Sequence, residues 1–216
     1  MNRRRSGLAF VLFASIFALF VAAIWFVSGS GAANAQTDIK TQSAPNADIC
    51  GNSWYDVHDA LATETDVELY TTSAISSNDI WAVGRHRPPG GSTTSGYAAH
   101  WDGVAWSPIP APTFAPQPYE TFNSVAAISH NNVWVVGWAC ASSPCTSLIE
   151  HWNGTAFSIV PSPNAPGAST SLFDIAAISA NDIWAVGSTN ASGVRRTLTM
   201  HWNGFTWSII AAPDTG

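Results

Sequence analysis

Three histidines stand at one recurrent position of the sequence, each directly before a tryptophan. They are His100, His151 and His201. Histidine is the commonest metal ligand in proteins, and a shared metal needs each ring nitrogen within about 2 Å of the ion. Equivalent positions on stacked sheets lie about 10 Å apart, so the three rings are not expected to converge. We predict a structural role for them, and no metal or other cofactor.

A second recurrent set could offer oxygen ligands. It consists of Asp79, Asn132 and Asp182, each at the end of a short polar segment. Carboxylate and amide oxygens suit calcium. In tight turns, however, these side chains usually bond nearby backbone, and this is the use that we expect.

Two glutamates could act as a pair of carboxyl groups. Cleavage of a glycosidic bond uses two carboxyls at a set separation across a pocket, and Glu120 and Glu150 lie in the repeated part of the chain. They occupy different positions in their repeats, and the sequence contains no nucleophile motif or glycine-rich phosphate loop. We therefore expect no catalytic residue, and we keep a polysaccharide hydrolase or lyase as the alternative.

Two of the three cysteines are close in sequence. Cys140 and Cys145 flank Ala-Ser-Ser-Pro. A zinc site would need further ligands nearby, so the spacing predicts a disulfide, provided that the chain is exported to an oxidising compartment. Cys50 is left as a free thiol or as the partner of another chain.

The N-terminus has the layout of an export signal. Three arginines at 3–5 precede an uncharged apolar run over 8–27, and small residues lead to Ala33-Asn34-Ala35. This pattern predicts a signal peptide over 1–35, followed by a linker over 36–50. The apolar run is also long enough to stay as a membrane anchor. In both cases the remainder is expected outside the cytoplasm, secreted or anchored.

Composition excludes one class of partner. The chain has 8 basic and 14 acidic residues and a formal net charge of −6. Because nucleic-acid binding needs a basic surface, no nucleic-acid partner is expected. The 11 tryptophans, with only 10% charged residues, favour strands over helices.

Two sequence blocks recur three times in the same order. The first, with the pattern Asn-Asp/Asn-Ile/Val-Trp-Ala/Val-Val-Gly, occupies 78–84, 131–137 and 181–187. The second, His-Trp-Asp/Asn-Gly, begins at the three recurrent histidines. Self-similarity at a period of about 50 residues indicates a repeat architecture.

Each repeat predicts four strands. The first block is apolar on both faces, so its strand must be covered on both sides. Asp-Gly or Asn-Gly in the second block predicts a hairpin with a type I′ turn, in which both residues have positive φ. We therefore predict an all-β fold of β-propeller-type blades. The blades span 66–110, 119–163 and 170–213 of a repeat domain over 51–216, and Gly51 to Trp54 predicts one extra N-terminal strand.

The IWAVG…HWNGxxW pattern resembles the repeats of secreted bacterial β-propeller proteins and, more distantly, kelch and Asp-box propellers. The chain lacks the Gly-Gly doublet of kelch repeats and the spacing of an Asp-box. The resemblance covers residues 51–212, and it implies a fold rather than an activity.

Antiparallel strands divide the expected blades into two ends. Short, near-identical turns share one end, and long loops that differ in every repeat share the other. Because binding residues concentrate in variable loops on a rigid scaffold, we predict a non-catalytic binding module for an extracellular glycan or protein. The residues expected to bind are Arg85, His86, Arg87, Tyr119, Glu120, Trp138, Arg195 and Arg196.

Three blades are fewer than the about four to eight of ordinary propellers. The sequence leaves open an open stack of blades, a ring closed by two chains, and a truncated copy without independent function. Exposed edges and apolar faces favour association, so a homo-oligomer is an expected partner.

Overall fold

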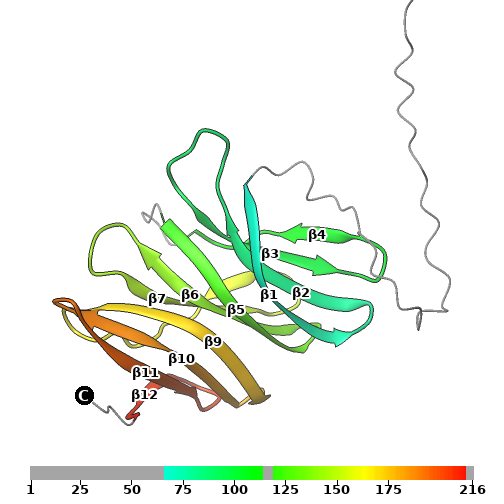
Figure 1. Ribbon diagram of the computed structural model, residues 1–216. Helices are drawn as coiled ribbons and strands as arrows, with labels where there is room; N and C mark the ends of the chain where they lie inside the picture. Colours follow the sequence, from blue (N-terminus) through cyan, green and yellow to red (C-terminus); the bar gives the residue numbers. More distant parts are fainter. Residues whose placement is uncertain (1–65, 114–118, 213–216) are drawn as a thin grey trace, which may run out of the picture. The chain divides into compact units, whose positions relative to one another are not determined.

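Three four-stranded antiparallel sheets make up the described part of the chain, residues 66–113 and 119–212 of the computed structural model (Figure 1). Within each sheet the strands lie side by side in chain order. This confirms the prediction of an all-β fold with three four-stranded antiparallel blades. We call the sheets blades 1, 2 and 3.

The blades have similar strand lengths. Blade 1 contains β1 (Val67–Ser76), β2 (Asp79–His86), β3 (Ser95–Trp101) and β4 (Trp106–Ile109). Blade 2 contains β5 (Tyr119–Ser129), β6 (Asn132–Cys140), β7 (Thr146–Trp152) and β8 (Phe157–Ile159). Blade 3 contains β9 (Ser169–Ser179), β10 (Asp182–Ala191), β11 (Val194–Trp202) and β12 (Trp207–Ile210).

Several sequence predictions concern residues outside the described ranges. They are the export signal or anchor over 1–35 with its apolar run 8–27, the linker over 36–50, Cys50, and the extra strand at 51–54. Within the described ranges, no helix has the length and apolar character needed to span a bilayer.

The glycine that ends the first sequence block lets two strands approach closely. Gly84, Gly137 and Gly187 each pair beside a bulge in the first strand of their blade. A Cβ atom at any of them would overlap a carbonyl oxygen of that strand. The recurrence of this glycine therefore has a packing reason in all three blades.

The Asp-Gly and Asn-Gly sequences do not form the predicted type I′ turn. Four residues, 102–105, link β3 to β4 because Trp101 pairs with Trp106, and of the turn pair only Gly103 has positive φ, at 96°. The Oδ1 atom of Asp102 accepts hydrogen bonds from the backbone N–H groups of Val104 and Ala105 at 2.8 and 2.9 Å. Blades 2 and 3 repeat this arrangement. Side-chain bonding to the backbone stabilises the longer loop.

Two apolar cores join the blades. Trp81 and Val83 of blade 1 pack in a core with Val133 and Val135 of β6. The alternate β6 residues, Trp134 and Val136, belong to the core shared with blade 3. The prediction that this strand is covered on both faces is thereby confirmed for blade 2.

One tryptophan of a blade contacts two aromatic rings of the next blade. The ring centroid of Trp81 lies 5.3 Å from that of Trp152 and 5.9 Å from that of Phe157. Trp134 repeats the arrangement with Trp202 and Trp207, at 5.0 and 5.9 Å. Because aromatic pairs add about 0.5–1.5 kcal/mol to the effect of area burial, these rings help to hold the blades together.

Blade 3 leaves an apolar face exposed. Trp184 and Val186 occupy the positions that Trp134 and Val136 occupy in blade 2, but no described blade follows them. Val186 is 45% exposed, whereas Val136 is 0% exposed. Ile178 of β9, on the same face, is 75% exposed. Exposed apolar patches of this kind mark interaction surfaces.

Candidate functional site

The strands give the blades two different ends. The turns after β1, β5 and β9 and the four-residue loops lie at one end, which we call the turn end. The connections after β2, β6 and β10, and the connectors between blades, lie at the other, which we call the loop end. The connections at the loop end span 87–94, 141–145 and 192–193, so they differ in length from blade to blade.

Two hydrogen bonds tie the loop end of one blade to the next blade. The N–H of Glu120 in β5 donates to the carbonyl oxygen of Thr94 at 2.8 Å, and that of Thr170 in β9 donates to Cys145 at 2.9 Å. Cys140 and Cys145 form the predicted disulfide, with their Cα atoms 4.6 Å apart. The loop end is therefore a braced surface rather than a set of independent loops.

The three basic residues of blade 1 lie where β2 ends. Arg85 and His86 are the last residues of β2, and Arg87 follows it. Arg85 forms an ion pair with Glu68 at 2.8 Å, and Arg87 forms one with Asp66 at 3.1 Å. The hydrogen bond from Arg85, followed by that from Tyr70, holds the pKa of Glu68 below its usual value.

Tyr119 and Trp138 lie at the loop end of blade 2. Tyr119 begins β5 and is exposed, and Trp138 in β6 is half-buried. Trp138 pairs with Thr121 on one side and with Ser147 on the other, so the indole ring has small polar neighbours across both strands.

The connection between β10 and β11 in blade 3 is short, whereas the sequence predicts a long loop there. A two-residue turn at Ser192-Gly193, with φ of 51° and 85°, joins Ala191 to its partner Val194. Arg195 and Arg196 are consequently exposed residues of strand β11 rather than of a loop. Positive φ at both turn positions is the geometry predicted for the Asn-Gly sites.

Glu120 and Glu150 are both buried. Glu120 is in β5 and Glu150 in β7, and each carboxyl lies beneath the surface of blade 2. Burial, together with the negative charge of Glu120, raises the pKa of Glu150 to about 8. A glycosidase must present both carboxyls to its substrate, so the burial argues against a catalytic use of this pair.

The turn end repeats one hydrogen-bonded group in every blade. The Nε2 atoms of His100, His151 and His201 donate to Asp79, Asn132 and Asp182 at 2.8, 2.9 and 2.9 Å. Each histidine therefore has its partner within its own blade, and the three do not share a site. Burial lowers the pKa of His151, which fits its neutral amide partner.

The tryptophan that directly follows each of these histidines adds a hydrogen bond at the turn end of the same blade. The indole N–H groups of Trp101, Trp152 and Trp202 donate to the carbonyl oxygens of residues 77, 130 and 180 at 3.1–3.2 Å. The His-Trp pairs thus tie the third strand of each blade to the turn between its first two strands.

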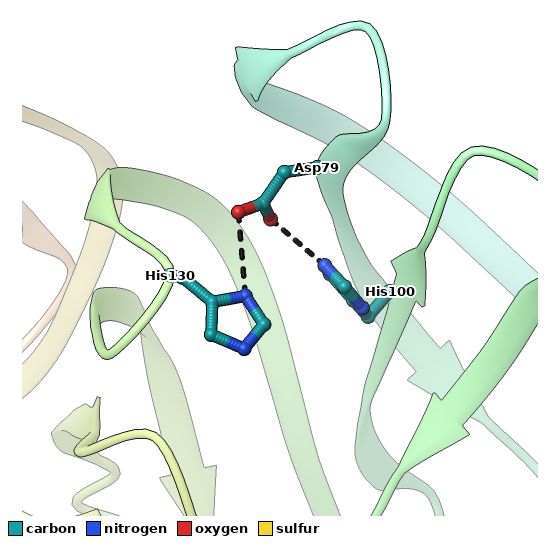
Figure 2. Close-up of side chains that lie close together, drawn as sticks. All are labelled: Asp79, His100 and His130. Carbon is teal, nitrogen blue, oxygen red and sulfur yellow. Dashed lines mark hydrogen bonds and ion pairs between the residues drawn. The ribbon is translucent and has the colours of Figure 1, made fainter.

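Blade 1 adds a third residue to this group. His130, from the β5–β6 turn of blade 2, places its Nδ1 atom 3.3 Å from Oδ2 of Asp79, while His100 occupies Oδ1 (Figure 2). Sequence reasoning missed His130 because it is 51 residues from Asp79. Its one signal was a histidine at a turn position that Ser77 and Ala180 hold in the other repeats.

Comparison with known proteins gives a likeness of fold. Neither a protein-family model nor a curated protein matches the chain. A mutant of the Bombyx mori GH32 beta-fructofuranosidase BmSUC1, in complex with sucrose, matches with a TM-score of 0.47 and 12% identity over 66% of this chain and 34% of the enzyme. YCF48 bound to D1 peptide matches with a TM-score of 0.42 and 18% identity, over 68% and 41% of the two chains.

Both solved structures contain β-propellers. The three sheets resemble propeller blades. The chain spans less than half of either protein, and at these identities the likeness carries no argument about activity or ligand.

Proposed function

We propose that the chain is an exported, non-catalytic binding module for an extracellular glycan or protein, with its binding surface at the loop end of the blades. The contrast between the two ends supports this most strongly. The turn end repeats the same side-chain bonds in each blade, whereas the loop end differs in length and residues and is still braced to the next blade. A rigid scaffold carrying divergent segments is the usual arrangement of a binding surface.

Of the residues predicted to bind, three carry this proposal best. Tyr119, Trp138 and Arg195 have exposed or half-buried side chains at the loop end. Sugars pack their C–H faces on aromatic rings, and Tyr119 and Trp138 provide two such rings at the loop end. A glycan is therefore the favoured ligand, and a protein is the alternative.

The disulfide supports export. Bonds such as Cys140–Cys145 persist in oxidising compartments and are rare in the cytosol. The mass of the purified mature protein tests the accompanying prediction that residues 1–35 are removed, since a retained anchor would leave the full 22.9 kDa chain.

We further propose that a second copy of the chain covers the exposed face of blade 3. The equivalent face of blade 2 is buried by a blade of this same sequence pattern, with Trp134 and Val136 in the core. Trp184 and Val186 repeat that face. Because Val186 and Ile178 are exposed in every copy, the same face of a second copy can pack against them.

A glycan array probed with the purified protein tests the binding proposal, with a surface pull-down as the arm for protein ligands. We expect binding by the natural sequence and its loss in a variant that combines Trp138→Ala and Arg195→Ala. Absence of any ligand in both arms, or binding that the double substitution leaves unchanged, would contradict a loop-end binding surface.

A further inference from the structure

We infer that Asp79, His100 and His130 form a binding site for a divalent transition-metal ion at the turn end of blades 1 and 2. Asp79 opens β2, His100 lies in the neighbouring strand β3, and His130 comes from the β5–β6 turn of the next blade (Figure 2). One ligand atom from each residue lies within 4.8 Å of the others. The site is independent of the binding surface proposed at the loop end.

Two of the donor separations are close to those around an ion of this class. In a tetrahedral site with bonds of about 2 Å, two ligand atoms lie about 3.3 Å apart. The distances here are 2.8 Å from Asp79 Oδ1 to His100 Nε2 and 3.3 Å from Asp79 Oδ2 to His130 Nδ1. The three donor atoms lie within 4.8 Å of one another rather than 3.3 Å, so the side chains must move closer together, which the exposed His130 ring allows, for an ion to replace the two hydrogen bonds.

The chemistry of the donors selects the ion. Two imidazoles with one carboxylate suit Zn²⁺ and its neighbours, whereas Ca²⁺ and Mg²⁺ prefer oxygen ligands alone. Three protein ligands leave one position of a tetrahedral ion for water or another small ligand.

The hydrogen bonds of Asp79 differ from those of Asn132 and Asp182, its counterparts in blades 2 and 3, in a way that suits a metal site. In blades 2 and 3 the equivalent side-chain oxygen accepts the indole N–H of Trp134 or Trp184 at 2.9 Å, besides the histidine. In blade 1 Oδ1 of Asp79 bonds His100, and Oδ2 lies 3.3 Å from Nδ1 of His130. The buried indole N–H of Trp81 has no hydrogen-bond partner within residues 66–113 and 119–212.

A buried N–H without a hydrogen-bond partner carries an energetic cost. The repeated fold does not require this cost, because blades 2 and 3 satisfy the same indole. A cation held by Asp79 and the two histidines provides a reason for it, since metal binding would offset the missing hydrogen bond.

Two of the ligands are held in place and the third is accessible. The side chains of Asp79 and His100 are 15% and 14% exposed, and the His100 ring contacts Trp81 in a tilted arrangement with centroids 4.8 Å apart. His130 is 69% exposed, so an ion can reach the site from solvent.

Among the described blades, only the boundary of blades 1 and 2 brings all three donors together. At the boundary of blades 2 and 3, Asn132 stands in place of Asp79 and Ala180 in place of His130. The repeat itself thus provides comparison positions for a test.

Titration of the purified protein, free of any affinity tag, with Zn²⁺ by calorimetry tests the inference. We expect one tight equivalent of Zn²⁺ and at least tenfold weaker binding in His130→Ala. Asp79→Asn should weaken binding similarly, and Asn132 of blade 2 indicates that the fold accepts an amide at this position. His201→Gln, in the equivalent pair of blade 3, should leave the affinity unchanged.

A Co²⁺-substituted sample should give the visible absorption of a tetrahedral ion, and His130→Ala should lose it. Equal Zn²⁺ affinity in the natural sequence and His130→Ala would overturn the inference, as would the absence of a tight equivalent or binding of Ca²⁺ with the same affinity. In any of these cases Asp79, His100 and His130 form an inter-blade hydrogen-bonded group and no metal site.

Discussion

Glu150 is a carboxyl group in a place where the other blades hold apolar side chains. Ala99 and Met200 occupy the equivalent positions of blades 1 and 3. Glu150 is fully buried, and neither carboxyl oxygen has a hydrogen-bond partner among the described residues. A buried ionised group without partners is unfavourable, which is why burial, with the charge of Glu120, raises the pKa of Glu150 to about 8.

Replacing Glu150 by Met should therefore stabilise the protein. The native state keeps a proton that the unfolded state, with a carboxyl pKa near 4.5, loses. The free energy of unfolding of the natural sequence should thus fall as the pH rises from about 4.5 to about 8. By pH 8.5 the free energy of unfolding of Glu150→Met should exceed that of the natural sequence by a few kcal/mol, because each unit by which the pKa is raised corresponds to about 1.4 kcal/mol. Urea denaturation at pH 5 and pH 8.5 measures it.

Glu150→Gln is the control, since it keeps the size and polarity of the side chain but removes the group that titrates. A pH dependence of stability that is the same in the natural sequence and in both variants would show that Glu150 does not retain its proton on folding.

The sequence could not predict these residue-scale features. The sequence places Glu150 directly before His151 in the second repeat, but the burial of its side chain depends on the neighbouring blade that packs against it. His130 likewise gains its role from Asp79 of another blade. Contacts between repeats combine residues about one repeat apart, and no local pattern marks them.

Strands were predictable because their signals are local. The apolar first block and the periodic recurrence predicted four strands in each blade, and the structure has them. The turn type was not predictable from Asn-Gly alone, since Asp102 and its counterparts bond the backbone two and three residues ahead. The predicted loop residues Arg195 and Arg196 are in a strand because Ser192-Gly193 closes a tight hairpin.

The inter-blade aromatic contacts predict different costs for the same substitution in two blades. Trp134→Ala removes a ring that contacts Trp202 and Trp207 of the next blade, and it should cost about 3–5 kcal/mol of stability. Trp184→Ala removes the equivalent ring of blade 3, which lies half-buried against His201, and in the monomer it should cost clearly less. Chemical denaturation of both variants measures the difference. Equal costs would contradict the packing of blade 2 against blade 3.

The exposed face of blade 3 predicts self-association of the whole molecule. If a second copy covers this face, then Val186→Lys combined with Ile178→Lys should lower the mass in solution, because two charges would have to be buried in the contact. Light scattering coupled to size exclusion measures this mass over a range of protein concentrations. Val104→Lys, at an exposed position in the turn-end loop of blade 1, is the control. A natural sequence that stays monomeric at all concentrations would contradict the proposed contact.

The sequence predicted the number of blades but not how they close. It left open a stack, a ring of two chains and a truncated copy, because closure depends on contacts at the first and last faces rather than within repeats. The structure adds that the two faces are unlike. Ala82 and Ala99 of blade 1 are buried, whereas Val186 and Ile178 of blade 3 are exposed.

The central claim is that one end of the blades binds and the other end is scaffold. Trp138 at the loop end and Phe205, an exposed ring at the turn end, are matched aromatic residues for a direct test. The dissociation constant of the ligand found on the array should rise at least tenfold in Trp138→Ala and stay unchanged in Phe205→Ala. A rise in Phe205→Ala with none in Trp138→Ala would contradict the claim.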